Sequence, residues 1–192
     1  KKLISGYRYR LTGFGFQSFL PYSGDFYSVV RKDLYSSVNL DGSMGKLEDL
    51  VYLSQCNDEG AYVRTDESSS RLIDGEGVVL GIFDFQVMEC GLFSEDLLPV
   101  LSDDSYAYYD SFAVKQFGNY EQAGAFQDGK AAVKQDGMWG IINSSGEFVS
   151  DERYSDILLD RNGYYLYDGI IVAAKDNLYS FYNSEWKVIS DF

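Results

Sequence analysis

Carboxylates are the most abundant groups in this sequence that could do acid–base chemistry, with 30 Asp and Glu against 16 Lys and Arg. Two carboxylates that flank a sugar bond can hydrolyse a glycoside, one as acid and the other as base or nucleophile. Three adjacent pairs are candidates, Asp58-Glu59, Glu95-Asp96 and Asp103-Asp104. Because nothing in the spacing singles out one pair, we interpret them as turn residues and keep a carboxylate-dependent glycoside hydrolase only as an unfavoured alternative.

Other catalytic and metal-binding groups are sparse. The chain has no His, which removes Ser-His-Asp and Cys-His triads and the commonest metal ligand. Cys56 and Cys90 lack zinc-site spacing, and we favour two separate thiols over a disulfide between them. Asp160, Asn162 and Gly163 begin like a calcium loop, but the closing Glu is missing, which favours an ordinary turn. We therefore expect no enzyme activity, no cofactor and no metal.

The net charge of −14 disfavours binding to nucleic acid and to anionic membranes, because both need a basic surface. The longest apolar runs, such as Val78–Phe83, are too short to span a bilayer. No signal peptide is recognisable. The compartment stays open, with the cell envelope or secretion favoured over the cytoplasm.

Tyrosine clusters are the best lead to a binding surface, since the chain has 17 Tyr and 13 Phe. Alternate residues of a strand face opposite sides, so each cluster places aromatic rings on both faces of a sheet. One face could be core and the other a stripe for a partner protein or a carbohydrate; the alternative is cross-strand packing within the sheet. The candidate partner-binding residues are Tyr106, Tyr108, Tyr109, Tyr164, Tyr165 and Tyr167.

The elements that must position these residues are β-hairpins, and the clearest lies within residues 125–149. It predicts a strand over 130–134, a tight turn at Asp136-Gly137 and a return strand over 138–143. Asp-Gly between two β-prone runs favours a type I′ turn, which needs positive φ at both central residues. Ser145-Gly146 predicts a second turn and residues 147–149 the start of a third strand. One segment, residues 46–54, could instead form a helix.

The same hairpin recurs along the chain. A shift of forty residues places Trp139 on Tyr179 without a gap, and a shift back by thirty-three places it on Tyr106. Two earlier copies, within 27–42 and 62–77, need a one-residue adjustment at the turn. We therefore predict one repeat array rather than two domains, with units at about 7–45, 46–82, 83–116, 117–153 and 154–192.

The segment from Phe126 to Gly146, with its Asp-Gly, Ala-Val-Lys and Asp-Gly-Met-Trp-Gly-Ile-Ile-Asn, resembles the WG repeat, a β-rich bacterial module named for its Trp-Gly pair. Tyr106-Ala107 and Tyr179-Ser180 replace that pair in two other units. The resemblance implies tandem β architecture, no general catalytic activity, and a role in protein interactions.

We predict an all-β protein of tandem antiparallel β-hairpin repeats, stacked as an elongated twisted array, with a closed propeller-like ring as the alternative. Single hairpins bury too little surface to be stable, so neighbours must share a core. The expected buried repeat positions are Val133, Trp139 and Ile142, with Tyr179 as a counterpart of Trp139. Gly140 should allow an indole or a neighbouring backbone to approach closely. The favoured function is a non-catalytic protein-interaction scaffold; the alternative is a carbohydrate-binding module of the cell envelope.

Overall fold

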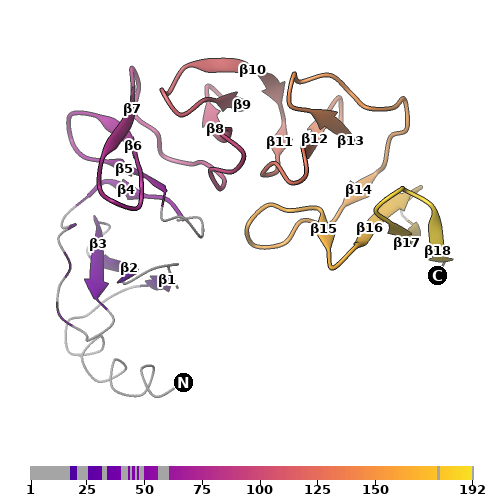
Figure 1. The fold of residues 1–192 in the computed structure, drawn as a ribbon, viewed down its shortest axis with the longest axis horizontal. Helices are drawn as coiled ribbons and strands as arrows, with labels where there is room; N and C mark the ends of the chain where they lie inside the picture. The colour runs from indigo at the N-terminus through magenta and orange to yellow at the C-terminus, as the bar shows by residue number, and fades with distance from the viewer. Residues whose placement is uncertain are drawn as a thin grey trace. The chain divides into compact units, whose positions relative to one another are not determined.

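The computed structural model of the chain describes residues 18–20, 26–31, 34–39, 43, 45, 47, 50–55, 61–176 and 178–191. These residues contain strands and turns but no helix, which confirms the all-β fold of antiparallel hairpins (Figure 1). The strands are β1 (Ser18–Leu20), β2 (Phe26–Arg31), β3 (Leu34–Asn39), β4 (Tyr52–Leu53), β5 (Tyr62–Thr65), β6 (Ser70–Ile73), β7 (Val79–Phe83), β8 (Leu98–Ser102), β9 (Ser105–Tyr109), β10 (Lys115–Tyr120), β11 (Gln122–Ala123), β12 (Lys130–Gln135), β13 (Met138–Asn143), β14 (Asp156–Ile157), β15 (Leu166–Tyr167), β16 (Ile170–Lys175), β17 (Leu178–Asn183) and β18 (Val188–Asp191).

The chain divides into two compact units, Lys1–Glu89 and Cys90–Phe192. Among the described strands, the first unit has two antiparallel sheets, ordered β1-β2-β3 and β4-β5-β6-β7. A bridge between Tyr35 and Leu50 extends the first of them. Leu50 also packs with Leu53, Tyr62 and Ile73 in a small apolar core.

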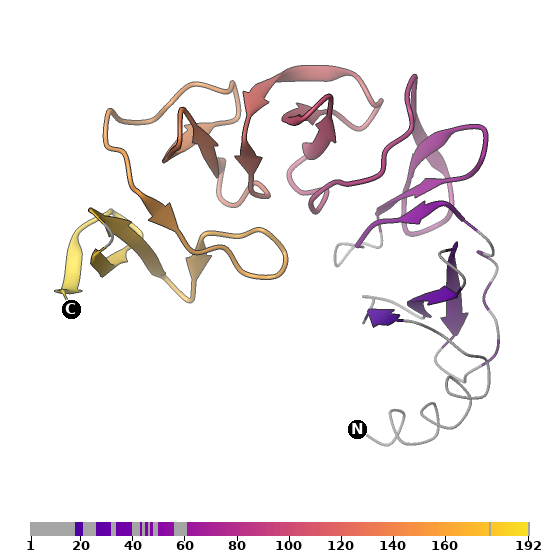
Figure 2. The same cartoon turned by 180° about the vertical axis from the view of Figure 1, so that it is seen from behind.

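The second unit has three antiparallel sheets within its described residues, ordered β10-β9-β8, β11-β12-β13 and β14-β16-β17-β18, with β15 paired to β16 (Figure 2). Bridges from Cys90 to Val100 and from Trp139 to Tyr154 place one more extended segment beside β8 and beside β13. The repeating element is thus an antiparallel meander of about four strands, which is within the usual size range of small sheets.

The central hairpin forms as the sequence predicts. Strands β12 and β13 pair from Lys130↔Asn143 to Gln135↔Met138. Asp136 and Gly137 have φ of 53° and 75°, the pair of positive values that a type I′ turn requires. The third predicted strand is reduced to one bridge, between Ile142 and Phe148.

Both sequence shifts hold in the backbone. A shift of forty residues aligns β12 and β13 with β16 and β17, whose pairing runs from Ile170↔Asn183 to Lys175↔Leu178. Thirty-three residues carry the turn Asp136-Gly137 onto Asp103-Asp104, which also have positive φ. Trp139, Tyr106 and Tyr179 therefore occupy the same place, the second residue of a return strand.

A second recurring device is a turn in which an Asp or Asn Oδ1 accepts two backbone N–H groups. In one copy Oδ1 of Asn143 accepts from Ser145 at 3.0 Å and from Glu147 at 3.0 Å. The same two-donor pattern occurs at Asp74, Asp110, Asp160 and Asn183. Such Asx turns fix a chain reversal locally, so the sequence needs no bound ion to form the loop at Asp160.

The helix considered for residues 46–54 does not occur in its described part. Leu50 lies in the bridge to Tyr35, and β4 takes up Tyr52 and Leu53. Strand pairing supplies backbone hydrogen bonds that helical spacing alone does not outweigh. Cys56 lies outside the described residues, and Cys90 is half-buried beside β8. Nowhere in the described part of the chain does a helix have the length and apolar character to cross a membrane.

Candidate functional site

Each sheet of the second unit has two faces that pack differently, and the β11–β13 sheet shows both. Side chains of directly paired residues lie on the same face. Ala131, Val133 and Ile142 share one face, which packs with Tyr108 of β9; we call it the near face because it meets the preceding sheet.

The opposite side, the far face, carries Ala132, Trp139 and Ile141. It packs against the following sheet, whose strands β14, β16 and β17 contribute the buried residues Ile157, Ile171, Ala173 and Tyr182. The expected buried residues Val133, Trp139 and Ile142 are all buried. They nevertheless divide between two faces rather than forming one, because the sheet lies between two neighbours.

Gly140 allows the close approach expected of it, but the approaching group differs. A Cβ at this position would lie 2.7 Å from Cε1 of Phe148, closer than side chains tolerate. The neighbour is therefore a phenylalanine ring from the segment after β13, and not an indole or a backbone.

The β14–β18 sheet repeats both faces. Its near face, with Ile171, Ala173 and Tyr182, is buried in the shared core. Val172 and Phe181, half-buried, lie on its far face with Tyr179. These positions match Ala132, Ile141 and Trp139 in the previous sheet after the forty-residue shift.

The far face of the β14–β18 sheet is the candidate site, because it is apolar and exposed. Tyr179 is 37% exposed, whereas Trp139 is 4% exposed. Ile170 and Tyr167, which are paired across β16 and β15 on the same face, are 41% and 37% exposed. Apolar side chains gathered on one exposed face are typical of an interaction surface.

Tyr179 is held in place from the side. Its hydroxyl donates a hydrogen bond to Oδ2 of Asp156, a β14 residue paired with Ala174 on the same face. This bond to a carboxylate raises the pKa of the Tyr179 hydroxyl above its ordinary value. Tyr179 of β17 is therefore oriented by a hydrogen bond to a β14 side chain, and its hydroxyl remains neutral near pH 7.

The six tyrosines predicted to bind a partner do not form one surface. Tyr108, Tyr109 and Tyr165 are buried, Tyr106 and Tyr164 are half-buried, and Tyr167 is exposed. Cross-strand aromatic packing therefore accounts for most of them, and Tyr167 is the one of the six that lies on the candidate site.

Tyr108 illustrates why these rings are inside. Its hydroxyl donates to the carbonyl oxygen of Gly124 at 2.7 Å, and its ring meets Phe126 edge-on at 5.0 Å. Burial raises the pKa of Tyr108 well above its usual range. A tyrosine can be enclosed in this way because its one polar group finds a backbone acceptor.

Sequence reasoning missed two features of this sheet. Ile170 and Val172 extend the apolar far face, and the shift from Lys130 and Ala132 could have indicated them. Trp186 occupies the position of Gly146, with a φ of 60°. The centroid of its ring lies 6.1 Å from that of Tyr165, on which it stacks, and 4.9 Å from that of Tyr154. The Trp186 ring therefore covers part of the near face.

No cluster of three or more His, Cys, Asp or Glu residues suited to a metal ion occurs among the residues that the structure describes. Two acidic side chains accept hydrogen bonds from the backbone of tight turns. The Glu95 carboxylate accepts one from the N–H of Gly129 at 2.9 Å, and the Glu121 carboxylate accepts one from the N–H of Gly137 at 2.8 Å. Carboxylates thus serve as caps of tight turns in this unit.

Comparisons with solved structures show a β-propeller-like fold. Hsv2p of Kluyveromyces lactis matches with a TM-score of 0.57 and 11% identity over 92% of this chain, which spans 64% of the length of Hsv2p. PorZ, a surface component of the type-IX secretion system of Porphyromonas gingivalis, matches with a TM-score of 0.54 and 7% identity over 91% of this chain and 29% of PorZ. At these identities the likeness concerns the fold and nothing further.

No curated protein sequence matches the chain. The family model of the WG containing repeat matches residues 116–139 and 139–179. These two adjacent segments include the β12–β13 hairpin and run into the next one, β16–β17. Residues 116–179 are therefore similar to the WG containing repeat in two adjacent segments, which supports a repeat-based β scaffold.

Proposed function

We propose that this protein is a non-catalytic scaffold that binds a partner protein through the far face of the β14–β18 sheet. One observation supports the proposal most: Tyr179, Ile170 and Tyr167 are exposed on a face whose counterpart in the preceding sheet is covered by another sheet. Apolar side chains displayed together at this scale favour association over solvation.

The covered counterpart indicates what the partner should present. The far face of the β11–β13 sheet is met by Ile157, Ile171 and Ala173, which are small or branched aliphatic residues. A partner surface of similar side chains would fit around the ring of Tyr179. The net charge of −14 would in addition attract a cationic partner over a distance that salt shortens.

The test is affinity capture from the native source with the purified chain as bait, at low and high salt. Tyr179→Glu should abolish capture of a specific partner, because it places a charge in an apolar contact. Leu178→Glu is the matched control, since Leu178 is 67% exposed but points to the other face. Capture of no partner at either salt concentration, or equal capture by both variants, would contradict the proposal.

A carbohydrate ligand is the second candidate, because two tyrosines of one face, Tyr167 and Tyr179, are both exposed. Aromatic rings with an apolar body and a polar tip suit a sugar surface as well as a protein. Binding to a glycan array that disappears in Tyr167→Ala and Tyr179→Ala would favour this candidate, and an array without hits would remove it.

A further inference from the structure

Strand β7 is an exposed, apolar edge strand. It ends the order β4-β5-β6-β7 and, within the described residues, pairs only with β6 (Figure 1). Residues 78–83 contain neither a charged residue nor a proline. Val78, Val79 and Ile82 are 54%, 43% and 61% exposed. An exposed edge of this kind is a template on which another strand can pair.

Another outer strand of the chain is protected in ways that β7 is not. Strand β10, at the end of its sheet, carries Lys115 and has two breaks of register around Gly118. Charges and bulges on an edge discourage pairing with other chains. Since β7 has one register break and no charge, its edge lacks these protections against a partner strand, and β6 is its one strand partner among the described residues.

The two ends of β7 are fixed by hydrogen bonds. Before the strand, Oδ1 of Asp74 accepts from the N–H groups of Glu76 and Val78. After it, the backbone of Val87 donates to Ser70 Oγ at 2.8 Å and accepts from Thr65 Oγ1 at 2.6 Å. Both hydroxyl residues are fully buried, so the segment that follows β7 is tied to the β5–β6 hairpin.

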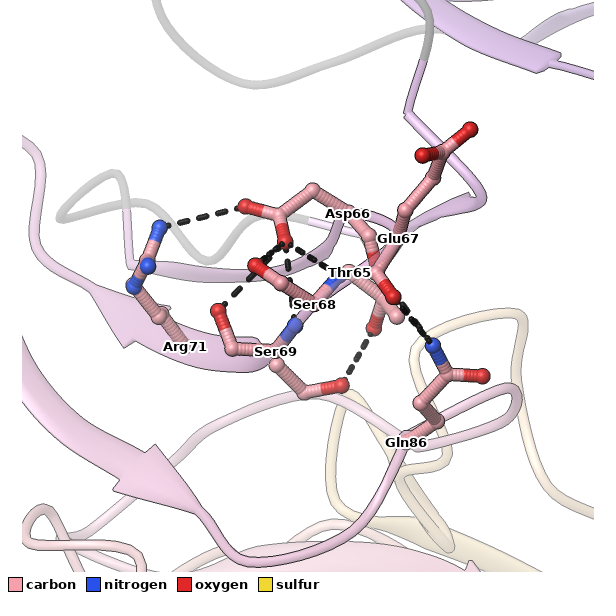
Figure 3. A network of polar contacts seen from close by, with 8 residues as sticks. Thr65, Asp66, Glu67, Ser68, Ser69, Arg71 and Gln86 are labelled. Carbon is pink, nitrogen blue, oxygen red and sulfur yellow. Dashed lines mark hydrogen bonds and ion pairs between the residues drawn. The ribbon is translucent and has the colours of Figure 1, made fainter.

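The hairpin turn that receives this segment is a dense polar network (Figure 3). Asp66 accepts hydrogen bonds from Ser68, Ser69 and Arg71, and those from Ser68 lower its pKa to about 2. Gln86 donates to the carbonyl oxygens of Asp66 and Glu67. An edge held at both ends needs little ordering when a partner binds, which favours affinity.

Acidic residues lie on both sides of the apolar run. Glu76 precedes it, Asp84 and Glu89 follow it, and all three are exposed. A pairing strand with basic residues at its ends would therefore complement this edge. We propose that β7 accepts a fifth strand: an extended segment of a partner protein with alternating β-branched side chains, flanked by Lys or Arg. This surface is in the other unit from the far face and uses backbone pairing.

The experiment uses a fluorescein-labelled peptide, Lys-Lys-Val-Thr-Val-Thr-Val-Lys-Lys, titrated with the full chain in fluorescence anisotropy. Saturable binding is expected, with slower hydrogen exchange of the β7 amides in the complex. Ile82→Lys should weaken binding by about tenfold or more, because it adds a charge to the edge. Leu178→Lys changes a similarly exposed site in the other unit; it should leave binding unchanged and controls for net charge.

A second peptide, methylated on alternate backbone nitrogens along one edge, separates strand pairing from attraction between charges. It keeps every side chain and charge but loses the donors that a β-ladder requires, so it should not bind. Equal binding of the methylated peptide, no saturable binding of the parent peptide, or binding unaffected by Ile82→Lys in a variant with an unchanged circular dichroism spectrum would overturn the proposal. Tyr179→Glu should leave peptide binding intact, so failure of the far-face proposal is distinguishable from failure of this one.

Discussion

The far faces of the β11–β13 and β14–β18 sheets have the same backbone and different surroundings. Trp139 and Tyr179 occupy the same register position, yet the first is enclosed by the next sheet and the second is exposed. The position of a residue within a repeat therefore fixes where its side chain points, but the neighbouring sheet decides whether it is buried. In arrays of repeats, much of the stability resides in such contacts between units.

The residue types follow the same difference. The covered far face carries Ala132, Trp139 and Ile141, and the exposed one carries Val172, Tyr179 and Phe181. Tyr takes the place of Trp where the ring is partly exposed to water, and its hydroxyl donates a hydrogen bond to Asp156. A tyrosine tolerates both an apolar contact and contact with water, which is compatible with the partner-binding role proposed for this face.

The largest expected effect comes from removing the covered aromatic side chain. Trp139→Ala should lower the free energy of unfolding by about 3–5 kcal/mol, because it leaves a large cavity between two sheets. Tyr179→Ala should cost about 1 kcal/mol or less, since the side chain is exposed. Urea denaturation followed by circular dichroism measures both, and equal losses would show that the two faces do not differ in coverage.

A methyl group added at a crowded turn should have the next largest effect. Gly146 has a φ of 80°, and a Cβ there would lie 2.6 Å from the ring of Phe117. Gly146→Ala should therefore cost about 2–3 kcal/mol through strain and overpacking. Gly137→Ala is the control, because Gly137 has a similar φ but no atom within 4 Å; its cost should be about 1–2 kcal/mol. Thermal unfolding of the two variants separates crowding from backbone strain.

Alkaline pH should weaken the covered interface. Burial raises the pKa of Tyr165 to about 12, with smaller contributions from Asp128 and Glu95, and burial likewise raises that of Tyr154 to about 12. Because the folded state holds these protons more tightly, their contribution to stability is complete below pH 10 and is lost between pH 10 and 12. Tyr165→Phe should make the fall in unfolding free energy across that range shallower; an unchanged slope would contradict the assignment.

The smallest difference is expected at the Asx turns, which are alike in both sheets. Asn143→Ala and Asn183→Ala each remove two hydrogen bonds to an exposed turn. Each should cost about 1 kcal/mol, which is typical of losing a side-chain cap. Similar losses of unfolding free energy in denaturant titrations would support the equivalence of the two turns, whereas a much larger loss at one of them would contradict it.

Much of the fold could be predicted because its signals are local. The Asp136-Gly137 turn and the gapless shifts place β12, β13, β16 and β17 correctly, since turn chemistry and strand alternation act over a few residues. Burial of Tyr108 and Tyr165 could not be predicted, because a strand with aromatic rings on both faces does not indicate which neighbours cover it. The positive φ of Trp186 was not predicted for a related reason, because its ring stacks on Tyr165, a residue distant in sequence.

The candidate site was located only in part. Tyr167 was predicted to bind a partner, whereas Tyr179 was predicted as a buried counterpart of Trp139 and is instead 37% exposed. Ile170 and Val172 can be placed on the same face only once the pairing of β15, β16 and β17 is known. The buried contacts of Thr65, Ser70 and Val87 left no signal in the sequence, because single hydroxyl residues are common on surfaces and in cores alike. Long-range pairing is the physical information that a local pattern lacks.

Hydroxyl-radical footprinting of the intact chain, read by mass spectrometry, tests the difference between the two far faces most directly. Tyr179 and Tyr167 should be oxidised at rates typical of exposed tyrosines, while Trp139, intrinsically the more reactive ring, should be protected to the level of Tyr108. Protection of Tyr179 equal to that of Trp139 in the isolated chain would contradict the account, because the face assigned to a partner would then already be covered.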